Sequence, residues 1–265
     1  MSIDDLAYSV PSTVLATLVV GITVLLSVLG LVIVRRLVPI ERLKANHDLA
    51  DPVLSVIGGL YAVLLAFVVF TVWEQYQDLL TNIRQEAAVV VDVHRDTLAY
   101  PPEFRTAAQA QIGEYVSAVI EDEWEKLGRR EDSVRTETAL ADLSLLYASY
   151  EPQTNGQTNV HAQTLSLLST LSDLHQVRVI QSRSDLPSVL WTVLFVGSFA
   201  TIASSYFFGL DSLRAHAALT AVLAANIALI IFVIIAMDFP FRGDVRITSE
   251  PFVRAQQTMT TLRAP

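Results

Sequence analysis

The chain has 265 residues, 52% of them hydrophobic, and carries a formal net charge of −9 at pH 7. Its mean hydropathy of +0.45 is too high for an ordinary soluble domain of this length. The acidic balance argues against nucleic acid as a partner, and the absence of cysteine excludes disulfides, thiolate metal sites and cysteine nucleophiles.

Four blocks of 21 to 23 residues contain no aspartate, glutamate, lysine or arginine. About 20 apolar residues in a helix cross a hydrocarbon core roughly 30 Å thick, so each block is long enough to span a membrane. The blocks are Ser12–Val34, Pro52–Val72, Pro187–Phe208 and Ala217–Met237. The first follows two aspartates and not the basic start of a secretory signal, so it is expected to be a retained span. The sequence therefore predicts an all-α membrane protein with four transmembrane helices.

A short basic connection, Arg35–Asp51, joins the first two spans. Short loops rich in arginine and lysine tend to stay in the cytoplasm, whereas the lead at residues 1–11 has no basic residue. This charge pattern places the lead, the region between the second and third spans, and the C-terminal tail outside the cytoplasm.

An acidic region lies between the second and third spans. Residues 73–185 contain nine basic and eighteen acidic side chains, which accounts for the whole net charge. Apolar residues recur there at helical spacing, without strand-like alternation of useful length. Helices are expected from the second span to Tyr100, from Pro102 to about Leu127, from about residue 133 to Tyr150, and over Val160–Gln181 after a loop at Glu151–Asn159. The sequence thus predicts a soluble, up-and-down helical domain between the second and third spans.

Turn residues mark the second half of the chain. Pro187 is expected in the first turn of the third span, Gly209 closes that span, and Asp211 is the expected cap of the fourth. A short amphipathic helix is expected from about Pro251. The predicted segments are the lead and first transmembrane hairpin (1–72), the soluble acidic domain (73–185), the second transmembrane hairpin (186–241) and the tail (242–265).

Motifs of catalysis and cofactor binding are missing from the sequence, including a phosphate loop, HExxH, GxSxG and a dinucleotide fingerprint. The five histidines lack the spacing of a metal site, and the carboxylates within Glu121–Glu125 are typical of a solvated helix face. The sequence therefore predicts no enzyme, no cofactor and no metal site.

The spans also lack the charged residue that ion-coupled transporters usually keep in the membrane. Their mid-span polarity comes from small and hydroxyl residues, which either let helices pack closely or line a narrow pore. Gly197, Thr201 and Ser204 fall on one face of the third span, and Gly58 lies in the second. These four residues are the pore-lining candidates, with close helix packing as the alternative.

Eight ionisable residues near the ends of the spans, or on the extension of the second span, are candidates for more than anchoring. They are Glu86, Arg178, Arg183, Asp211, Arg214, His216, Asp238 and Arg242. Most of them are expected to snorkel toward water. Glu86 is different, because it lies on a partly apolar helix face where a carboxylate usually pairs with an arginine; Arg178 and Arg183 are the expected partners.

Short motifs in a fixed order resemble the bestrophin-like domain proteins of bacteria, from about residue 40 to 255. They are Asn46 through Leu60-Tyr61, Trp73 with Tyr76, Glu86-Ala87, Tyr115 with Glu123-Trp124, Arg178 with Arg183, Leu186-Pro187 with Trp191, and the ending Asp238–Gly243 followed by Ser249–Phe252. Bestrophins are pentameric ion channels with two spans, a helical cytosolic domain and two more spans. The resemblance therefore implies the same layout, and a cytosolic domain where the charge pattern indicates an external one.

These observations favour a bestrophin-like, homo-oligomeric ion channel in a bacterial inner membrane, in contact with lipid and passing inorganic ions. The alternative is a membrane-anchored scaffold or sensor whose helical domain binds a partner. Bulky substitutions at Thr201 or Gly58 would change the conductance of a pore and leave a scaffold unaffected.

Overall fold

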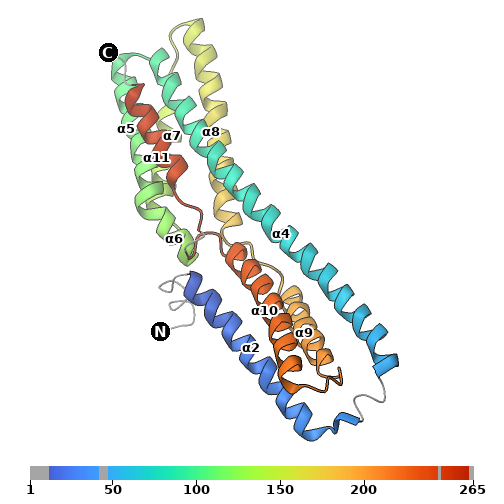
Figure 1. Cartoon of the computed structure of the whole chain (residues 1–265). Helices are drawn as coiled ribbons and strands as arrows, with labels where there is room; N and C mark the ends of the chain where they lie inside the picture. The colour runs from blue at the N-terminus through green and yellow to red at the C-terminus, as the bar shows by residue number, and fades with distance from the viewer. Residues whose placement is uncertain (1–11, 42–46, 244–245, 263–265) are drawn as a thin grey trace. The chain divides into compact units, whose positions relative to one another are not determined.

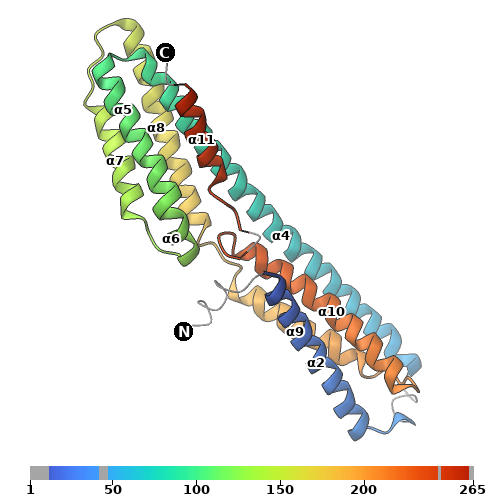
Figure 2. The ribbon, with the colours of Figure 1, turned by 60° about the vertical axis from the view of Figure 1, so that its left-hand side comes forward.

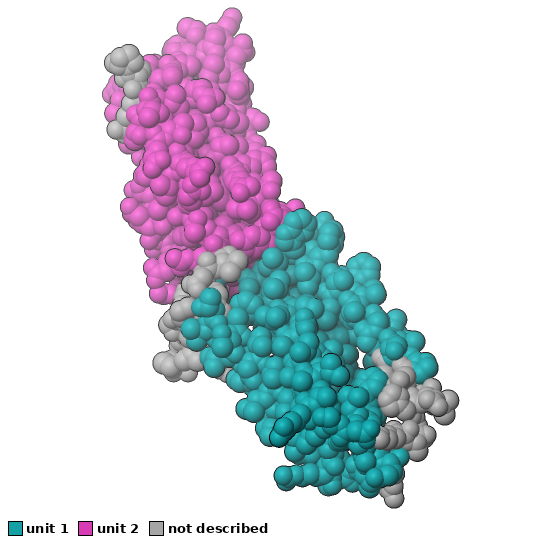
Figure 3. All heavy atoms as spheres, in the orientation of Figure 1, with its two compact units in different colours: residues 1–75, 185–238, 242–245 teal, residues 76–184, 239–241, 246–265 magenta. Residues whose placement is uncertain are grey.

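The computed structural model describes residues 12–41, 47–243 and 246–262, and in these ranges the regular secondary structure is helical throughout. The chain divides into two compact units (Figure 3). The membrane unit comprises residues 1–75, 185–238 and 242–245, and the bundle unit comprises residues 76–184, 239–241 and 246–265. The predicted all-α class is confirmed.

The membrane unit contains α2 (Ser12–Leu37), the first half of α4 (His47–Asp96), α9 (Ser188–Ser205) and α10 (Leu213–Asp238) (Figure 1). All four helices are long and apolar enough to cross a membrane, so each predicted span coincides with a candidate membrane-spanning helix. Residues 1–11 and the part of the basic connection that carries Arg42 and Lys44 lie outside the described residues.

Two tyrosine side chains of the membrane unit pack directly against glycines of other helices. A Cβ atom added to Gly30 of α2 would lie 2.7 Å from the hydroxyl of Tyr206, which itself donates a hydrogen bond to the Ser27 carbonyl oxygen (2.9 Å). A Cβ atom added to Gly197 of α9 would overlap the ring of Tyr61 on α4. Glycine at these two positions therefore lets a tyrosine from another segment pack against the helix backbone.

Helix α4 is 50 residues long, about 75 Å at 1.5 Å per residue. It continues past the predicted membrane boundary because no glycine or proline occurs between Leu60 and Tyr100 to end it. A short 3₁₀ turn, Thr97–Ala99, follows it, and the Pro101–Pro102 pair then begins α5. The predicted extension of the second span is thus confirmed.

The bundle unit packs the second half of α4 with α5 (Pro102–Ala118), a π-helical turn (Val119–Glu123), α6 (Trp124–Arg129), α7 (Val134–Ala148) and α8 (Asn155–Gln181) (Figure 2). Helix α8 begins earlier than predicted, so the loop expected at Glu151–Asn159 ends at Thr154. The reason is a helix cap, because the Thr154 hydroxyl accepts a hydrogen bond from the backbone N–H of Gln157 (3.2 Å).

The C-terminal helix α11 (Glu250–Thr261) belongs to the bundle unit and not to a separate tail. Its buried residues Phe252, Ala255 and Met259 join the core of the bundle. The segment before it is held by the Trp124 indole N–H, which donates to the Ile247 carbonyl oxygen (3.1 Å). The amphipathic helix was predicted from the sequence, but its packing into the acidic domain was not.

Candidate functional site

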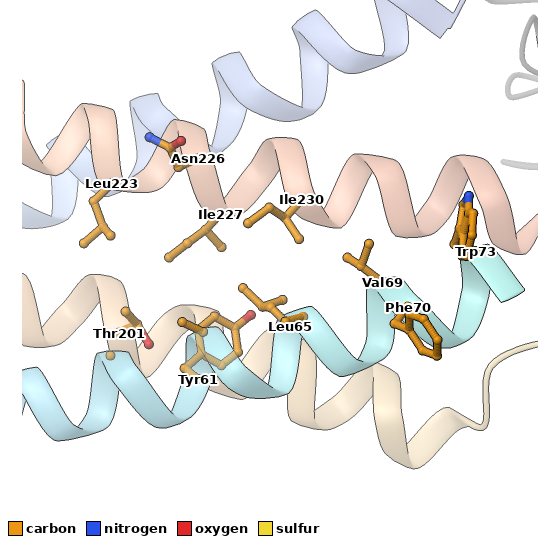
Figure 4. Close-up of a pocket in the computed structure, with 13 residues that line it drawn as sticks. Tyr61, Leu65, Val69, Phe70, Trp73, Thr201, Leu223, Asn226, Ile227 and Ile230 are labelled. Atoms are coloured by element: carbon orange, nitrogen blue, oxygen red, sulfur yellow. The ribbon is translucent and has the colours of Figure 1, made fainter.

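A groove of about 640 Å³ lies within the membrane unit (Figure 4). Helices α4 and α10 form its walls, and α9 contributes Thr201. The lining residues are Gly58, Tyr61, Ala62, Leu65, Ala66, Val69, Phe70 and Trp73 of α4, Thr201 of α9, and Leu223, Asn226, Ile227 and Ile230 of α10. The lining is therefore almost wholly apolar, with the hydroxyl of Thr201 and the amide of Asn226 as its mid-span polar groups.

Two of the four predicted pore-lining residues are engaged in contacts within the chain. Gly197 lies under the Tyr61 ring, and the Tyr61 hydroxyl donates to the Leu194 carbonyl oxygen (2.8 Å) beside the Ser198 hydroxyl (2.6 Å). Ser204 donates its hydroxyl proton to the Thr201 carbonyl oxygen (2.7 Å). Packing against Tyr61 accounts for Gly197, and a hydrogen bond within α9 engages Ser204; the role of both residues in a pore stays a prediction.

The other two candidates, Gly58 and Thr201, meet at the groove. A Cβ atom added to Gly58 would have no neighbour within 4 Å, so no described segment of the chain packs against it. Thr201 is 8% exposed, and its hydroxyl has no hydrogen-bond partner among the described residues. The structure thus brings these two residues together at one groove of the membrane unit.

A second surface, which shares Phe70 with the groove, lies on the side of α4 away from its buried face. Exposed residues recur there at alternating intervals of three and four, which keeps them on one side of a helix. They are Val53, Val56, Leu60, Val63, Phe67 and Phe70, and the next step in the series is the exposed Glu74. We call this set the α4 stripe. It is apolar over the predicted span and becomes acidic where the span ends.

Two carboxylates share one arginine in the core of the bundle unit. Glu86 of α4 accepts two hydrogen bonds from Arg178 of α8, at 2.7 Å from Nε and 3.1 Å from Nη2. The same Nη2 atom donates to Glu123 Oε2 (2.9 Å). Exposure of all three side chains is 2% or less. The predicted pair between Glu86 and an arginine is confirmed, with Arg178 as the partner.

Two further side chains complete this cluster. The Tyr115 hydroxyl donates to Glu86 Oε1 (2.6 Å), and His175 Nε2 donates to Glu123 Oε1 (2.8 Å). Burial and the Glu86 carboxylate raise the pKa of Tyr115 well above its usual value, so the phenol remains a donor. We call Glu86, Tyr115, Glu123, His175 and Arg178 the buried ion-pair cluster.

Sequence reasoning missed that Glu123 belongs to this cluster, because it lies within a run of carboxylates typical of a solvated face. The chain forms a π-helical turn over Val119–Glu123, and one extra residue per turn changes which side chains point inward. Glu123 is 2% exposed, whereas Glu125 is on the surface and pairs with Arg129. The sequence did contain a signal for a buried carboxylate: His175 and Arg178 lie one turn apart on α8, and both bond Glu123.

Aromatic rings cover the remaining side of the arginine. The Arg178 guanidinium carbon lies 5.4 Å from the Trp124 ring centroid and 5.6 Å from that of Phe252. Both distances fall within the range of cation–π attraction. The Arg178 guanidinium group therefore joins α8 to α4, the π-helical turn, α6 and α11.

Acid is expected to weaken the bundle through Glu123. Burial alone would raise its pKa, but Arg178 and His175 outweigh that effect and hold the pKa of Glu123 below its usual value. Stability from this group is therefore fully present above the ordinary glutamate pKa of 4.5 and is lost as pH falls through the lower folded value. Melting temperatures of the purified protein between pH 7 and pH 3 should fall less steeply for Glu123→Gln than for the wild type. The exposed Glu125→Gln is the control and should follow the wild type; a Glu123→Gln curve parallel to the wild type would contradict this expectation.

Two of the residues covered by the general expectation of snorkelling are buried, namely His216 and Asp238. This corrects the expectation from the sequence, and the reason is that each bonds a group inside the fold. His216 Nε2 donates to the Ser205 carbonyl oxygen across the α9–α10 turn (2.9 Å). Asp238 Oδ1 accepts from the Leu186 N–H (3.0 Å), which joins the end of α10 to the approach to α9.

The remaining interfacial candidates lie nearer the surface. Arg183 forms an exposed ion pair with Asp132. Asp211 and Arg214 are exposed, and Arg242 is half-buried. Asp211 was the predicted cap of the fourth span, but the hydroxyl that accepts from the first turn of α10 is that of Ser212, from the N–H of Ala215 (3.3 Å). Within the described ranges no three histidine or acidic side chains are grouped to hold a metal ion.

Known proteins resemble this chain in sequence and in fold. A family model described as Bestrophin-like domain matches residues 21–252, whereas no curated protein matches the chain. Two crystal structures of a bacterial bestrophin homolog from Klebsiella pneumoniae, each with one mutation, match with TM-scores of 0.66 and 0.67 at 11% identity. These matches cover 91% and 93% of this chain and 99% of each of those chains. A further crystal structure, of a membrane protein, matches with a TM-score of 0.65 at 11% identity over 91% of this chain and 97% of that one.

Proposed function

This chain belongs to the bestrophin-like domain family, and on that premise we propose that it forms a homo-oligomeric ion channel in a bacterial inner membrane. The observation that carries the proposal is the α4 stripe. A pore built from several copies needs, on each copy, an exposed helix face that crosses the membrane and ends in groups able to attract ions. The stripe has these properties, since its apolar residues lead to Glu74.

Conduction past such a stripe needs no charge inside the membrane. Hydrophobic constrictions are known to control ion flow by wetting and dewetting, and rings of carboxylates favour cations. Copies of Leu60, Val63 and Phe67 would form the constriction in a symmetric assembly, and copies of Glu74 would form an acidic ring at one mouth. Asp78, also exposed, follows one turn later on α4 and adds to the negative charge. The proposed permeant ions are therefore inorganic cations.

The membrane side of the bundle unit is also a proposal. Helix α2 ends with Arg35 and Arg36, at the start of the basic connection. Short basic loops favour the cytoplasm, which supports an extracytoplasmic bundle. A bundle in the cytosol is the alternative implied by the family resemblance.

Cysteine accessibility tests the proposed pore wall directly, because the wild-type chain contains no cysteine and therefore gives no background labelling. Currents through Leu60→Cys channels in planar bilayers should fall when a positively charged, water-soluble thiol reagent is added. The expected cause is that the reagent reaches the water-filled pathway and places a bulky cation in the constriction.

The matched control is Leu25→Cys on α2, which is also a large and exposed apolar position, 60% exposed against 69% for Leu60. A lipid-facing position should not react with a reagent confined to water, so its currents should not change. Equal insensitivity of Leu60→Cys and Leu25→Cys, with functional channels in both cases, would refute the α4 stripe as the pore wall.

A further inference from the structure

We propose that Tyr61 is a positioning residue that sets the width of the ion pathway by holding α4 at a fixed distance from α9. The inference rests on the proposed channel, in which the α4 stripe lines the pathway. It adds the contact that fixes the position of that stripe. This contact lies wholly within one copy of the chain, between its second and third spans.

Tyr61 bridges α4 and α9 with both its ring and its hydroxyl group. The side chain is 7% exposed and lines the groove (Figure 4). Its hydroxyl oxygen lies 2.8 Å from the Leu194 carbonyl oxygen and 2.6 Å from the Ser198 hydroxyl oxygen. Among the described residues from Ser55 to Gln75, no other side chain of α4 forms a hydrogen bond to another helix. Tyr61 is therefore the polar link between this span and α9.

The ring of Tyr61 acts as a spacer between the two helices. A Cβ atom added to Gly197 would lie 2.4 Å from two ring carbons, whereas ordinary van der Waals contact begins at 3.4 Å. One added methyl group must therefore move the ring about 1 Å away from α9. The ring cannot turn aside freely, because hydrogen bonds hold its hydroxyl end at α9. The displacement is therefore passed on to α4.

A displacement of α4 away from α9 carries the α4 stripe with it. At about 100° per residue, the centre of the stripe lies roughly 130° around the helix from Tyr61, on the side that faces away from α9. Leu60 and Val63 of the stripe are close to Tyr61 in the sequence and are 69% and 55% exposed. The groove separates this part of α4 from α10, so packing between those two helices does little to resist the movement. Pressure on Tyr61 thus pushes the proposed constriction into the pathway and narrows it.

Single-channel recording of Gly197→Ala in planar bilayers tests this role. The added methyl group should lower the unitary conductance several-fold. Tyr61→Leu in the same chain should restore it, because the shorter side chain makes room at the contact between α4 and α9. A general packing defect would lower stability and would not be reversed by this second change. An unchanged conductance in Gly197→Ala, or a loss that Tyr61→Leu does not reverse, would overturn the proposal.

Gly21→Ala is the matched control. It makes the same change within a span, but a Cβ atom there has nothing within 4 Å, so its conductance should equal that of the wild type. Tyr61→Phe is a second control, because it keeps the ring and therefore the spacing. Its conductance should also stay close to that of the wild type. A loss in Gly21→Ala as large as that in Gly197→Ala would show a general effect of alanine in the spans and reject the spacer.

A distance measurement keeps the inference testable if Gly197→Ala does not assemble. Spin labels on Val56→Cys of α4 and Phe199→Cys of α9 report the separation of the two helices, since both positions are exposed and the chain has no other cysteine. Labelled chains are diluted into unlabelled ones, so that pulsed electron paramagnetic resonance reads distances within one chain. Tyr61→Leu should shorten the mean distance, and an unchanged distance would overturn the proposal.

The positioning role and the channel fail separately. Unitary currents whose conductance ignores Gly197→Ala, together with a label distance that ignores Tyr61→Leu, would keep the channel and reject the role of Tyr61. Silent bilayers of the wild type, together with a label distance that shortens in Tyr61→Leu, would keep Tyr61 as the spacer between α4 and α9 and reject the channel.

Discussion

Replacing Arg178 by methionine is expected to cause the largest loss of stability of any single substitution in the bundle unit. The change leaves Glu86 and Glu123 in the core without their cation, and removing one partner of a buried ion pair costs about 3–5 kcal/mol. That loss is a large fraction of the stability of a typical domain. Chemical unfolding of the detergent-solubilised protein, followed by far-UV circular dichroism, measures it.

Arg183→Met is the matched control for this substitution. Arg183 also pairs with a carboxylate, that of Asp132, but both side chains are exposed, and exposed pairs contribute less than about 1 kcal/mol. Similar stabilities of Arg178→Met and Arg183→Met would contradict the account of the buried ion-pair cluster. A large loss in Arg178→Met that Glu86→Gln partly restores would support it, because the second change removes one of the unpaired charges.

Charge reversal at Glu74 is expected to have the largest effect on ion selectivity. Glu74→Arg would replace the proposed acidic ring by a basic ring at the same mouth, and such a ring favours anions over cations. The reversal potential under a salt gradient should therefore shift toward the anion equilibrium potential, and the single-channel cation current should fall several-fold. Recordings from purified protein in planar bilayers measure both quantities.

Glu151→Arg is the control for net charge, because Glu151 is an exposed glutamate in the turn before α8 and is not part of the α4 stripe. It makes the same change in total charge without placing that charge on the α4 stripe. A reversal potential that Glu74→Arg leaves unchanged, or that Glu151→Arg shifts by the same amount, would rule out Glu74 as part of the selectivity site.

The fold followed from the sequence wherever one physical rule dominated. The length of the four uncharged blocks predicted the spans, and the absence of helix breakers after Leu60 predicted the long α4. Helix α8 began earlier than predicted, because the cap at Thr154 outweighs the helix-breaking tendency of Gly156 near the helix start. Packing of α11 into the bundle depends on contacts far apart in the sequence, and no local pattern in the tail reports them.

Less of the candidate site than of the fold could be predicted from the sequence. The pairing of Glu86 with an arginine was predictable, because a carboxylate on an apolar helix face needs a cation. Burial of Glu123 depends on a π-helical turn that shifts its direction, and residue spacing for a regular helix does not anticipate such a turn. Small residues in the spans were ambiguous in the same way, since only the positions of neighbouring side chains distinguish Gly197, covered by Tyr61, from the open Gly58.

The central claim is that this chain conducts ions, and single-channel recording of the purified protein in planar bilayers under a potassium chloride gradient tests it most directly. The account predicts reproducible unitary currents that reverse near the potassium equilibrium potential. Silent bilayers, with the protein shown to be inserted and assembled, would contradict the channel and favour a membrane-anchored scaffold or sensor.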